Sequence, residues 1–464
     1  MIVGVITARM TKNIKDFALG GHRLGPTVIA FSERASGESA WLIIGLPGAA
    51  MVAGLLELWT VVGCITGIIL SWIIIAKPIR SATDEFGAIT LPELLAKKYN
   101  DENGTIRWLS SIIITFFFTF YVAAQFAGAG KVLNVTFGLT EMQGMIIGAF
   151  IIVFYTILGG FLAVAWTDLI QGIIMIGTLV ILPVVGWIEY ANLPVHEAVF
   201  DWSTLFNGKS GVPALIGVIG GLSWGLGYVG QPHLIARFMA IDKIENIKIS
   251  RRIAAAWAIP AFFGSLVIGL VGIKLLSAGV LGNESIVSGI INDPEKLMPL
   301  MATTLLNPWI AGILISGAIA AMMSTADSQL LVSTTVLTED VFSRIFKTST
   351  NKIDLLFIGR ICTVIIGLVA FVFAWKTENL VFEMVSYAWS GLGASFGPAL
   401  LLTLWWKKTT KKGVMAGLIT GALVTIVWAN VDGLQALITE RFSSFVLAFL
   451  AVIIFSLGDK SNEI

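Results

Sequence analysis

The sequence is poor in the residues that build metal centres and disulfides. Its 464 residues include only two cysteines and three histidines. Cys64 and Cys362 both lie in apolar runs, and two cysteines provide neither a disulfide framework nor a CxxC pair. His22, His196 and His233 are too far apart in the chain to predict a transition-metal site. These absences argue against a disulfide-stapled domain and against a zinc protein.

Charged residues are also scarce, and the two signs balance. They make up 13% of the chain, with 30 Lys and Arg against 29 Asp and Glu, so the formal net charge is +1. A chain without an excess of one sign offers no basic surface for nucleic acid. Apolar residues, by contrast, make up 56%, and the mean hydropathy is +0.88. Such a composition lies far outside the range of water-soluble proteins and predicts an all-α polytopic membrane protein, with the lipid bilayer as its surroundings.

Twelve segments come close to or exceed the roughly 20 apolar residues that a membrane-spanning helix needs. We place them at 27–49, 56–76, 108–128, 144–166, 168–190, 211–234, 251–277, 308–337, 354–376, 380–405, 413–430 and 440–457. The first residues, 1–9 (MIVGVITAR), read as the end of a truncated first transmembrane helix.

Basic residues alternate between the loops. One set of loops, which includes 235–252 and the C-terminal tail, holds 22 of the 30 Lys and Arg. Because basic loops stay in the cytoplasm, we expect a cell (inner) membrane protein with a cytoplasmic C-terminus.

The first complete span contains an unusual polar stretch. Residues 31–42 read FSERASGESAWL and place Glu33, Arg34 and Glu38 at mid-span. Irregular backbone at membrane depth is tolerated only where it faces protein or a polar cavity. The stretch therefore predicts an unwound helix beside a site. A kink closed by an ion pair between Arg34 and Glu33 or Glu38 is the alternative.

A second span is interrupted in the same manner. Residues 218–236 read VIGGLSWGLGYVGQPHLIA, with five glycines followed by Pro232. The two irregular spans are five helices apart. A pair of broken helices at equivalent places in two halves indicates a transporter built from inverted repeats, whose substrate and ions bind near the midplane.

Oxygen-bearing side chains in two other spans point to an ion site. Ser324, Thr325, Asp327 and Ser328 fall within about one helical turn of span 308–337. Asp168 opens span 168–190, where it could also serve as a helix cap. A carboxylate inside a membrane is costly and by default suggests a function. Carboxylate, hydroxyl and carbonyl oxygens suit a hard cation.

Over nearly its whole length the sequence resembles the sodium/solute symporter family, and within it the bacterial sodium/proline symporters. The resemblance is carried, in order, by DFALGGHRLGP, SERASGESAWLIIGLPGA, LGGFLAVAWTDLIQ, SWGLGYVGQPHLIARFMA and MSTADSQLLVSTTVLTED. It implies thirteen spans around a 5+5 inverted-repeat core with two discontinuous helices. The repeats would occupy 27–190 and 211–405, and two further transmembrane helices would occupy 413–457.

The resemblance also implies binding residues. The main sodium site would use backbone carbonyls of Ala35, Glu38 and Ala321 and the hydroxyls of Ser324 and Thr325. The proline pocket would comprise Trp41, Tyr121, Trp224, Tyr228 and Pro232. A second ion or proton site would involve Asp168, Asp327 and Ser328.

This chain departs from the proline symporter pattern at the coupling site. Gly37 stands where those relatives have an aspartate important for sodium, whereas Glu38 and Asp327 are acidic here. Two nearby carboxylates could hold one cation, or one of them could carry a proton because like charges do not both ionise cheaply. The resemblance thus implies a symporter that imports L-proline with sodium by alternating access. Proton coupling, and another small amino acid, betaine or a carboxylate as substrate, are the alternatives.

Other classes of protein fit the sequence less well. Asp168 and Asp327 could serve an intramembrane aspartyl hydrolase, but the GxGD context of such enzymes is missing. We therefore expect no enzymatic activity. We also expect a sodium ion as the coupling ion, no nucleic-acid ligand and no required protein partner.

Overall fold

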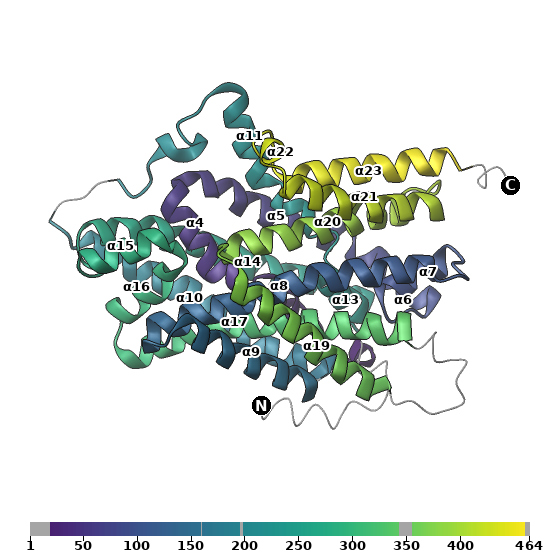
Figure 1. The fold of residues 1–464 in the computed structure, drawn as a ribbon, viewed down its shortest axis with the longest axis horizontal. Helices are drawn as coiled ribbons and strands as arrows, with labels where there is room; N and C mark the ends of the chain where they lie inside the picture. The colour runs from purple at the N-terminus through teal and green to yellow at the C-terminus, as the bar shows by residue number, and fades with distance from the viewer. Residues whose placement is uncertain (1–18, 159, 195–197, 343–354, 460–464) are drawn as a thin grey trace.

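The computed structural model of the chain describes residues 19–158, 160–194, 198–342 and 355–459 (Figure 1). In this part of the chain the regular elements are helices, and the only strand-like feature is an isolated bridge between Leu24 and Ile241. The all-α fold expected from composition is therefore confirmed. Residues 1–9, expected to end a further span, lie outside the described residues.

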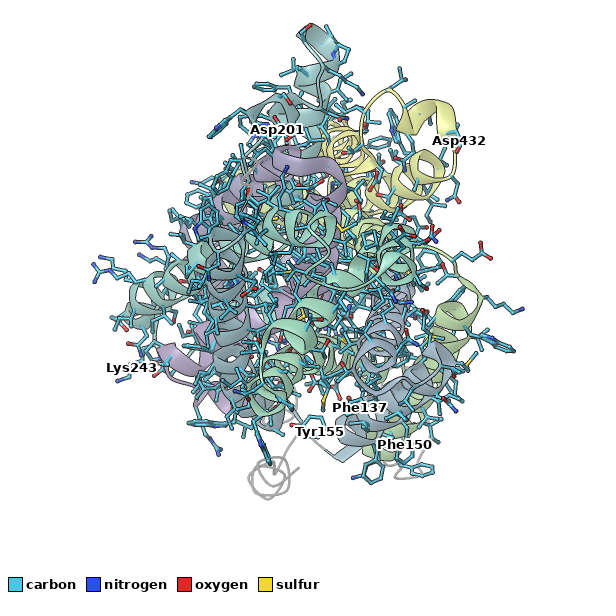
Figure 2. The ribbon with its side chains drawn as sticks, turned by 90° about the vertical axis from the view of Figure 1, so that its left-hand side faces the viewer. Phe137, Phe150, Tyr155, Asp201, Lys243 and Asp432 are labelled. Atoms are coloured by element: carbon cyan, nitrogen blue, oxygen red, sulfur yellow. The ribbon has the colours of Figure 1, made fainter. Side chains whose placement is uncertain are left out.

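Long helices run side by side along one direction of the molecule, and Figure 2 looks along that direction. These long helices are α5 Leu58–Ile74, α8 Thr105–Phe137, α9 Glu141–Leu158, α10 Phe161–Ala191, α14 Ile247–Ser277, α17 Pro308–Thr335, α19 Leu355–Lys376, α20 Val381–Trp405, α21 Lys411–Ala429 and α23 Glu440–Leu457. Shorter helices belong to the interrupted segments of the chain: α3 Pro26–Gly37, α4 Leu46–Ala53, α11 Gly211–Leu222, α12 Trp224–Gly227 and α13 Pro232–Ala240.

Shorter helices cover the two ends of this bundle. At one end lie α15 Glu284–Asn292 and α16 Leu297–Leu305, and at the other lie α6 Ala76–Phe86 and α7 Leu91–Lys98 (Figure 1). We call these the α15 end and the α7 end. The short α22, Asp432–Gln435, joins α21 to α23. In the end view, Asp432 and Phe150 of α9 lie at opposite edges of the bundle (Figure 2).

Eight of the described helices are long and apolar enough to cross a membrane. A ninth span arises if the broken pair Gly211–Gly227 and Pro232–Ala240, bent by 42°, is counted as one. The helices are interrupted or short where the sequence is polar or glycine-rich, as in α3 with 12 residues. The chain is therefore a multi-pass membrane protein.

One boundary predicted from the sequence was wrong. Spans were expected at 144–166 and 168–190, but α9 ends at Leu158 and α10 begins at Phe161. The extended backbone of Gly160 precedes α10 and separates the two helices. Asp168 therefore lies inside α10 and does not cap it.

Proline and a capping residue start several of these helices. Pro26 opens α3 and Pro308 opens α17, where the missing N–H of proline is not needed. Asn307 accepts a hydrogen bond from the Ile310 N–H and so caps α17. α3 packs against α10, α13, α14 and α17 and so lies among helices of both halves of the chain. Repeat boundaries at 27–190, 211–405 and 413–457 stay a prediction.

Candidate functional site

The first broken helix is present where the polar stretch predicted it. α3 ends at Gly37, Glu38 and Ser39 are not helical, and the chain continues as the π-helical turn η2, Trp41–Gly45. The interruption leaves backbone groups that need partners. The Ala40 N–H finds one in the side-chain oxygen of Gln125 on α8, at 3.1 Å. Buried protein groups thus satisfy the opened main chain, as a membrane interior requires.

The second break lies between α12 and α13. Residues 228–231 separate the two helices, and Gln231 Nε2 donates to the carbonyl of Trp389 at 3.0 Å. Glycine makes the packing here possible: a Cβ added to Gly230 would lie 2.5 Å from the backbone nitrogen of Gly397 on α20. The break is thus held between protein elements.

Between the breaks, oxygens of α3 and α17 meet. Ser324 Oγ donates to the carbonyl of Ala35 at 2.8 Å and to that of Ala321 at 3.1 Å. Thr325 Oγ1 donates to the carbonyl of Ser36 at 3.0 Å. All five residues are buried. The structure therefore brings together four of the five residues expected to bind sodium, in an all-oxygen cluster that suits a hard cation.

The fifth expected ligand, Glu38, lies at the break itself, and its carboxylate is bound by Arg34 and Tyr228. Arg34 NH1 donates to Glu38 Oε1 at 2.6 Å, and Arg34 also pairs with Glu33 through two hydrogen bonds. Tyr228 OH donates to the Glu38 carboxylate at 3.0 Å, and Trp72 Nε1 donates to Glu33 Oε2 at 3.2 Å. The ion pair considered as an alternative to unwinding is thus formed together with the unwound turn.

A second polar cluster surrounds the guanidinium of Arg237 on α13. Arg237 NH2 donates to Asp168 Oδ2 at 3.2 Å, to Ser36 Oγ at 2.8 Å and to Ser328 Oγ at 2.5 Å. Arg237 Nε donates to Ser32 Oγ at 3.1 Å. Sequence reasoning had assigned Arg237 to a basic loop, and this assignment was wrong because α13 continues to Ala240 and the side chain is fully buried.

Asp327 lies at the edge of the same region. Ser328 Oγ is 3.5 Å from Asp327 Oδ1, and Asp327 Oδ2 accepts no hydrogen bond from the described residues. Oδ1 of Asp168 is likewise without a partner in the described part of the chain. The structure thus places Asp168 and Ser328 together around Arg237, with Asp327 beside Ser328.

Four of the five residues expected to line a substrate pocket form a buried aromatic cluster. The indoles of Trp41 and Trp224 stack with centroids 4.8 Å apart. The Tyr121 OH accepts a long hydrogen bond from Ser39 Oγ at 3.5 Å, which links it to the break. Tyr228 packs edge-on against Trp389, 4.7 Å between centroids. The sequence-based prediction did not include Trp389. Its surroundings could have indicated it, because Trp389 lies among small residues in SYAWSGLGASFG, as Trp224 does in SWGLG.

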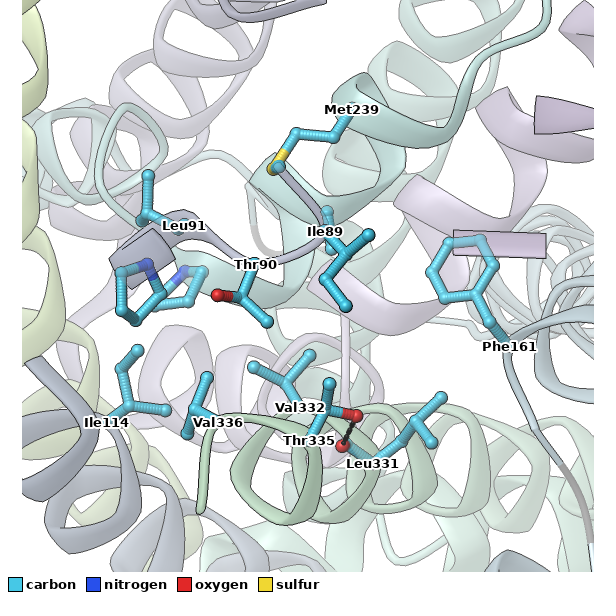
Figure 3. A pocket seen from close by; sticks show the side chains of 13 residues that line it. Ile89, Thr90, Leu91, Ile114, Phe161, Met239, Leu331, Val332, Thr335 and Val336 are labelled. Atoms are coloured by element: carbon cyan, nitrogen blue, oxygen red, sulfur yellow. Dashed lines mark hydrogen bonds between the residues drawn. The ribbon is translucent and has the colours of Figure 1, made fainter. Parts of the chain in front are cut away.

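Pro232, the fifth residue, lies at the start of α13 and lines a different cavity, shown in Figure 3. This cavity of about 30 Å³ is apolar and lies between α13, α17, α10 and the segment 89–92. Figure 3 shows Phe161, Met239 and Leu331 around it, with the Thr335 hydroxyl donating to the Leu331 carbonyl. A space of this size is comparable to the room one water molecule takes.

Comparison with known proteins gives concordant matches. The family model described as sodium:solute symporter family matches residues 17–421. The high-affinity proline transporter PutP of Bacillus subtilis is 38% identical, with 98% of this chain and 95% of that protein covered. The sodium/proline symporter of Escherichia coli is 36% identical, with 99% and 91% covered.

Solved structures show the same fold. A sodium-coupled sialic acid symporter superimposes with a TM-score of 0.74 at 17% identity, covering 99% of this chain and 95% of that one. Mhp1, a nucleobase-cation-symport-1 family transporter, gives a TM-score of 0.57 at 13% identity, covering 97% of both. At such identities the likeness concerns the fold alone.

Proposed function

The chain belongs to the sodium:solute symporter family and is therefore a sodium-coupled transporter rather than an enzyme, and we propose that its substrate is L-proline. Two relatives that align over almost the whole chain carry proline in their names. The observation that carries the mechanism is the contact between the opened end of α3 and the Ser324 hydroxyl of α17.

We place the sodium ion at that contact. Its ligands are the carbonyls of Ala35, Glu38 and Ala321 and the hydroxyls of Ser324 and Thr325. Carbonyls released by an unwound helix are oriented dipoles, and they coordinate a monovalent cation without a thiolate or imidazole. Because these ligands come from two helices, sodium bound there holds α3 against α17. Each charge that enters along the membrane potential contributes about 2.3 kcal/mol per 100 mV.

The proposed substrate site is the neighbouring aromatic cluster of Trp41, Tyr121, Trp224 and Tyr228, and it includes Pro232 at the start of α13, which lines the cavity of Figure 3. Aromatic faces suit the apolar pyrrolidine ring of proline, and the tyrosine hydroxyls suit its polar groups. The 4.8 Å stack of Trp41 on Trp224 leaves no room for a ligand between the two rings. A proline that binds between these indoles therefore requires them to part, with a movement of α12 relative to η2.

Asp168, Asp327 and Ser328 form a second ion or proton site in this proposal. Both carboxylates are fully buried. Asp327 lies about one turn after Ser324 on α17, and Asp168 accepts a hydrogen bond from the hydroxyl of Ser36, the residue whose carbonyl accepts from Thr325. The positive charge that compensates them decides how many ions move with each substrate molecule.

The protein sits in the cell (inner) membrane with the α7 end and the C-terminus in the cytoplasm. The basic loops support this orientation: Lys97 is part of α7, Arg107 pairs with Glu93 of α7, and Lys411 pairs with Asp101, which follows α7 in the chain. Sodium and proline then enter from the α15 end and leave toward the cavity of Figure 3 by alternating access. No additional protein subunit is needed for this cycle.

Uptake of radiolabelled proline into proteoliposomes tests the function. An inward sodium gradient is expected to drive accumulation above equilibrium, and a pH gradient alone is not. Accumulation under the pH gradient alone would refute sodium coupling. Absence of proline uptake under both gradients would refute the substrate, and betaine, other small amino acids and carboxylates would then be tested in the same vesicles.

A further inference from the structure

A cation from the last helix lies over one of the tryptophans of the proposed substrate site. Arg441 is the second residue of α23, and its Cζ lies 4.7 Å from the centroid of the Trp224 ring. α23 belongs to 413–457 and so lies outside both of the repeats predicted at 27–190 and 211–405. The contact therefore joins a helix from outside the predicted repeats to the proposed substrate site.

Three contacts dock the start of α23 on the second broken helix. The Thr439 hydroxyl lies 3.4 Å from the hydroxyl of Ser223, the residue before Trp224. Arg441 NH2 donates to the carbonyl of Gly220 at 3.4 Å, and the guanidinium lies over the Trp224 ring. Glycine at 220 permits this approach, because a Cβ there would lie 3.2 Å from the Thr439 methyl group. Arg441 is thus placed directly beside the turn that carries Trp224.

α20 holds the same guanidinium from another direction. Arg441 NH1 donates to Ser386 Oγ, and the preceding residue, Glu440, accepts from Ser386 and Ser390 at 3.0 Å each. The Arg441 side chain is 13% exposed, and the gap beside it between α12, α20 and α23 has no room for a water molecule. Because cation–π contacts strengthen where water is excluded, this one is expected to restrain the Trp224 ring.

We propose that Arg441 is a positioning residue of the substrate site, whose guanidinium holds the Trp224 ring in the orientation that binds the substrate. The inference rests on the proposed function, in which Trp224 contacts proline. Arg441 acts through this ring and does not itself contact the substrate. The C-terminal helices thereby contribute to substrate affinity, whereas the residues expected to bind substrate or ions all lie between Ala35 and Ser328.

The contact matters because the substrate displaces another partner of the ring. Trp224 stacks on Trp41, with 14° between the two planes. A proline that binds between the indoles breaks this stack, whereas the contact with Arg441 can persist. Loss of a cation–π contact lowers the population of the held orientation by about 3- to 30-fold. Since the apparent affinity falls with the fraction of molecules that are competent to bind, the KM for proline rises by up to the same factor.

Initial proline uptake into proteoliposomes at saturating sodium tests the proposal. Arg441→Gln is expected to raise the KM for proline about 3- to 30-fold and to leave the maximal rate within about 2-fold. Arg441→Lys keeps a cation that can lie over the ring, so its KM is expected to stay within about 2-fold of the wild-type value. The sodium concentration for half-maximal uptake is expected to be unchanged in both variants. The proposed sodium ligands lie on α3, at its end and on α17, whereas Arg441 contacts α11, α12 and α20.

Two comparisons separate positioning of the ring from packing of the helix. In a Trp224→Ala protein, adding Arg441→Gln is expected to raise the KM no further, because the ring on which Arg441 acts is gone. Glu440→Gln is the matched control. Glu440 also docks α23 on α20, through Ser386 and Ser390, but its hydrogen bonds do not go to Trp224. Its variant is expected to keep the wild-type KM for proline.

An unchanged KM in a monodisperse Arg441→Gln protein would overturn the proposal. An equal rise in Glu440→Gln, or a further rise when Arg441→Gln is added to Trp224→Ala, would also overturn it. Arg441→Met replaces Arg441→Gln if the latter aggregates in size-exclusion chromatography. Aggregation of both variants counts against the proposal as well, because a residue that only positions Trp224 is not needed for folding.

Failure of the proposed substrate is seen separately, in the wild type. If the wild-type protein takes up no proline, the same KM comparison is made with whichever of betaine, the other small amino acids and the carboxylates accumulates in the vesicles. If none of them accumulates, the proposed transport function and this inference are both refuted.

Discussion

Removing the Ser324 hydroxyl is the most direct perturbation of the proposed sodium site. This hydroxyl lies 2.8 Å from the Ala35 carbonyl and 3.1 Å from the Ala321 carbonyl, so its oxygen is a ligand of any ion placed among them. Interactions between a neutral polar group and a charge contribute about 1.5–3 kcal/mol. Since about 1.4 kcal/mol corresponds to a factor of ten in affinity, Ser324→Ala is expected to raise the sodium concentration for half-maximal proline uptake about 10- to 100-fold.

The assay is initial proline uptake into proteoliposomes over a series of external sodium concentrations. Ser333→Ala provides a matched control on the same helix. Ser333 is as fully buried as Ser324, but its hydroxyl has no hydrogen-bond partner among the described residues. Its removal is expected to leave the sodium dependence unchanged. Equal sodium dependence in Ser324→Ala and wild type, or an equal rise in both variants, would refute the placement of the ion.

Three further predictions concern the residues around this site. Trp224→Ala removes one ring of the 4.8 Å stack. It is expected to raise the KM for proline about 10-fold or more, because about 1.5 kcal/mol of aromatic contact is lost. Trp309→Ala is the control: this side chain is 86% exposed, and its removal is expected to leave the KM for proline unchanged. Gly230→Ala places a methyl group 2.5 Å from a backbone atom and is expected to lower the free energy of unfolding by about 1–3 kcal/mol. A thermal-shift assay in detergent then shows a lower melting temperature. Gly289→Ala, whose methyl group would meet nothing within 4 Å, is expected to show no such decrease. Arg34→Leu leaves two buried carboxylates without their cation and is expected to cost about 3–5 kcal/mol of stability; wild-type melting behaviour would contradict the importance of this ion pair.

The positions of both helix breaks could be predicted from the sequence because their cause is local. Polar residues and glycine in FSERASGES weaken a helix wherever they occur, and at membrane depth they require protein partners. The structure places the first break at Glu38 and Ser39, within that stretch. The meeting of Ser324 and Thr325 with α3 was expected from the family resemblance, and the hydrogen bonds to Ala35 and Ser36 confirm that these residues are neighbours.

Features that depend on side-chain reach could not be predicted in this way. Arg237 follows a glycine- and proline-containing break and precedes a basic loop, so charge counting alone assigned it to the loop. Its position inside the bundle depends on hydrogen-bond acceptors that are distant in sequence: Asp168 is 69 residues away and Ser328 is 91 residues away. Gln125 is a similar case: only the fold shows that its amide faces the N–H of Ala40.

α3 explains why ion and substrate are coupled in this fold. Its end and the residue that follows it make three different sets of contacts: the carbonyls of Ala35 and Ser36 face α17, the hydroxyls of Ser32 and Ser36 face Arg237, and the side chain of Glu38 faces Tyr228. A helical turn that is unwound at Glu38 has lost the hydrogen bonds that would otherwise fix it, so these outside contacts determine its conformation. If sodium binds at the first set of contacts as proposed, it changes the position of Glu38 and, through the hydrogen bond between them, that of Tyr228 in the proposed substrate site. The same argument makes Arg237 a second determinant of that turn, because its guanidinium donates to the hydroxyls of Ser32 and Ser36.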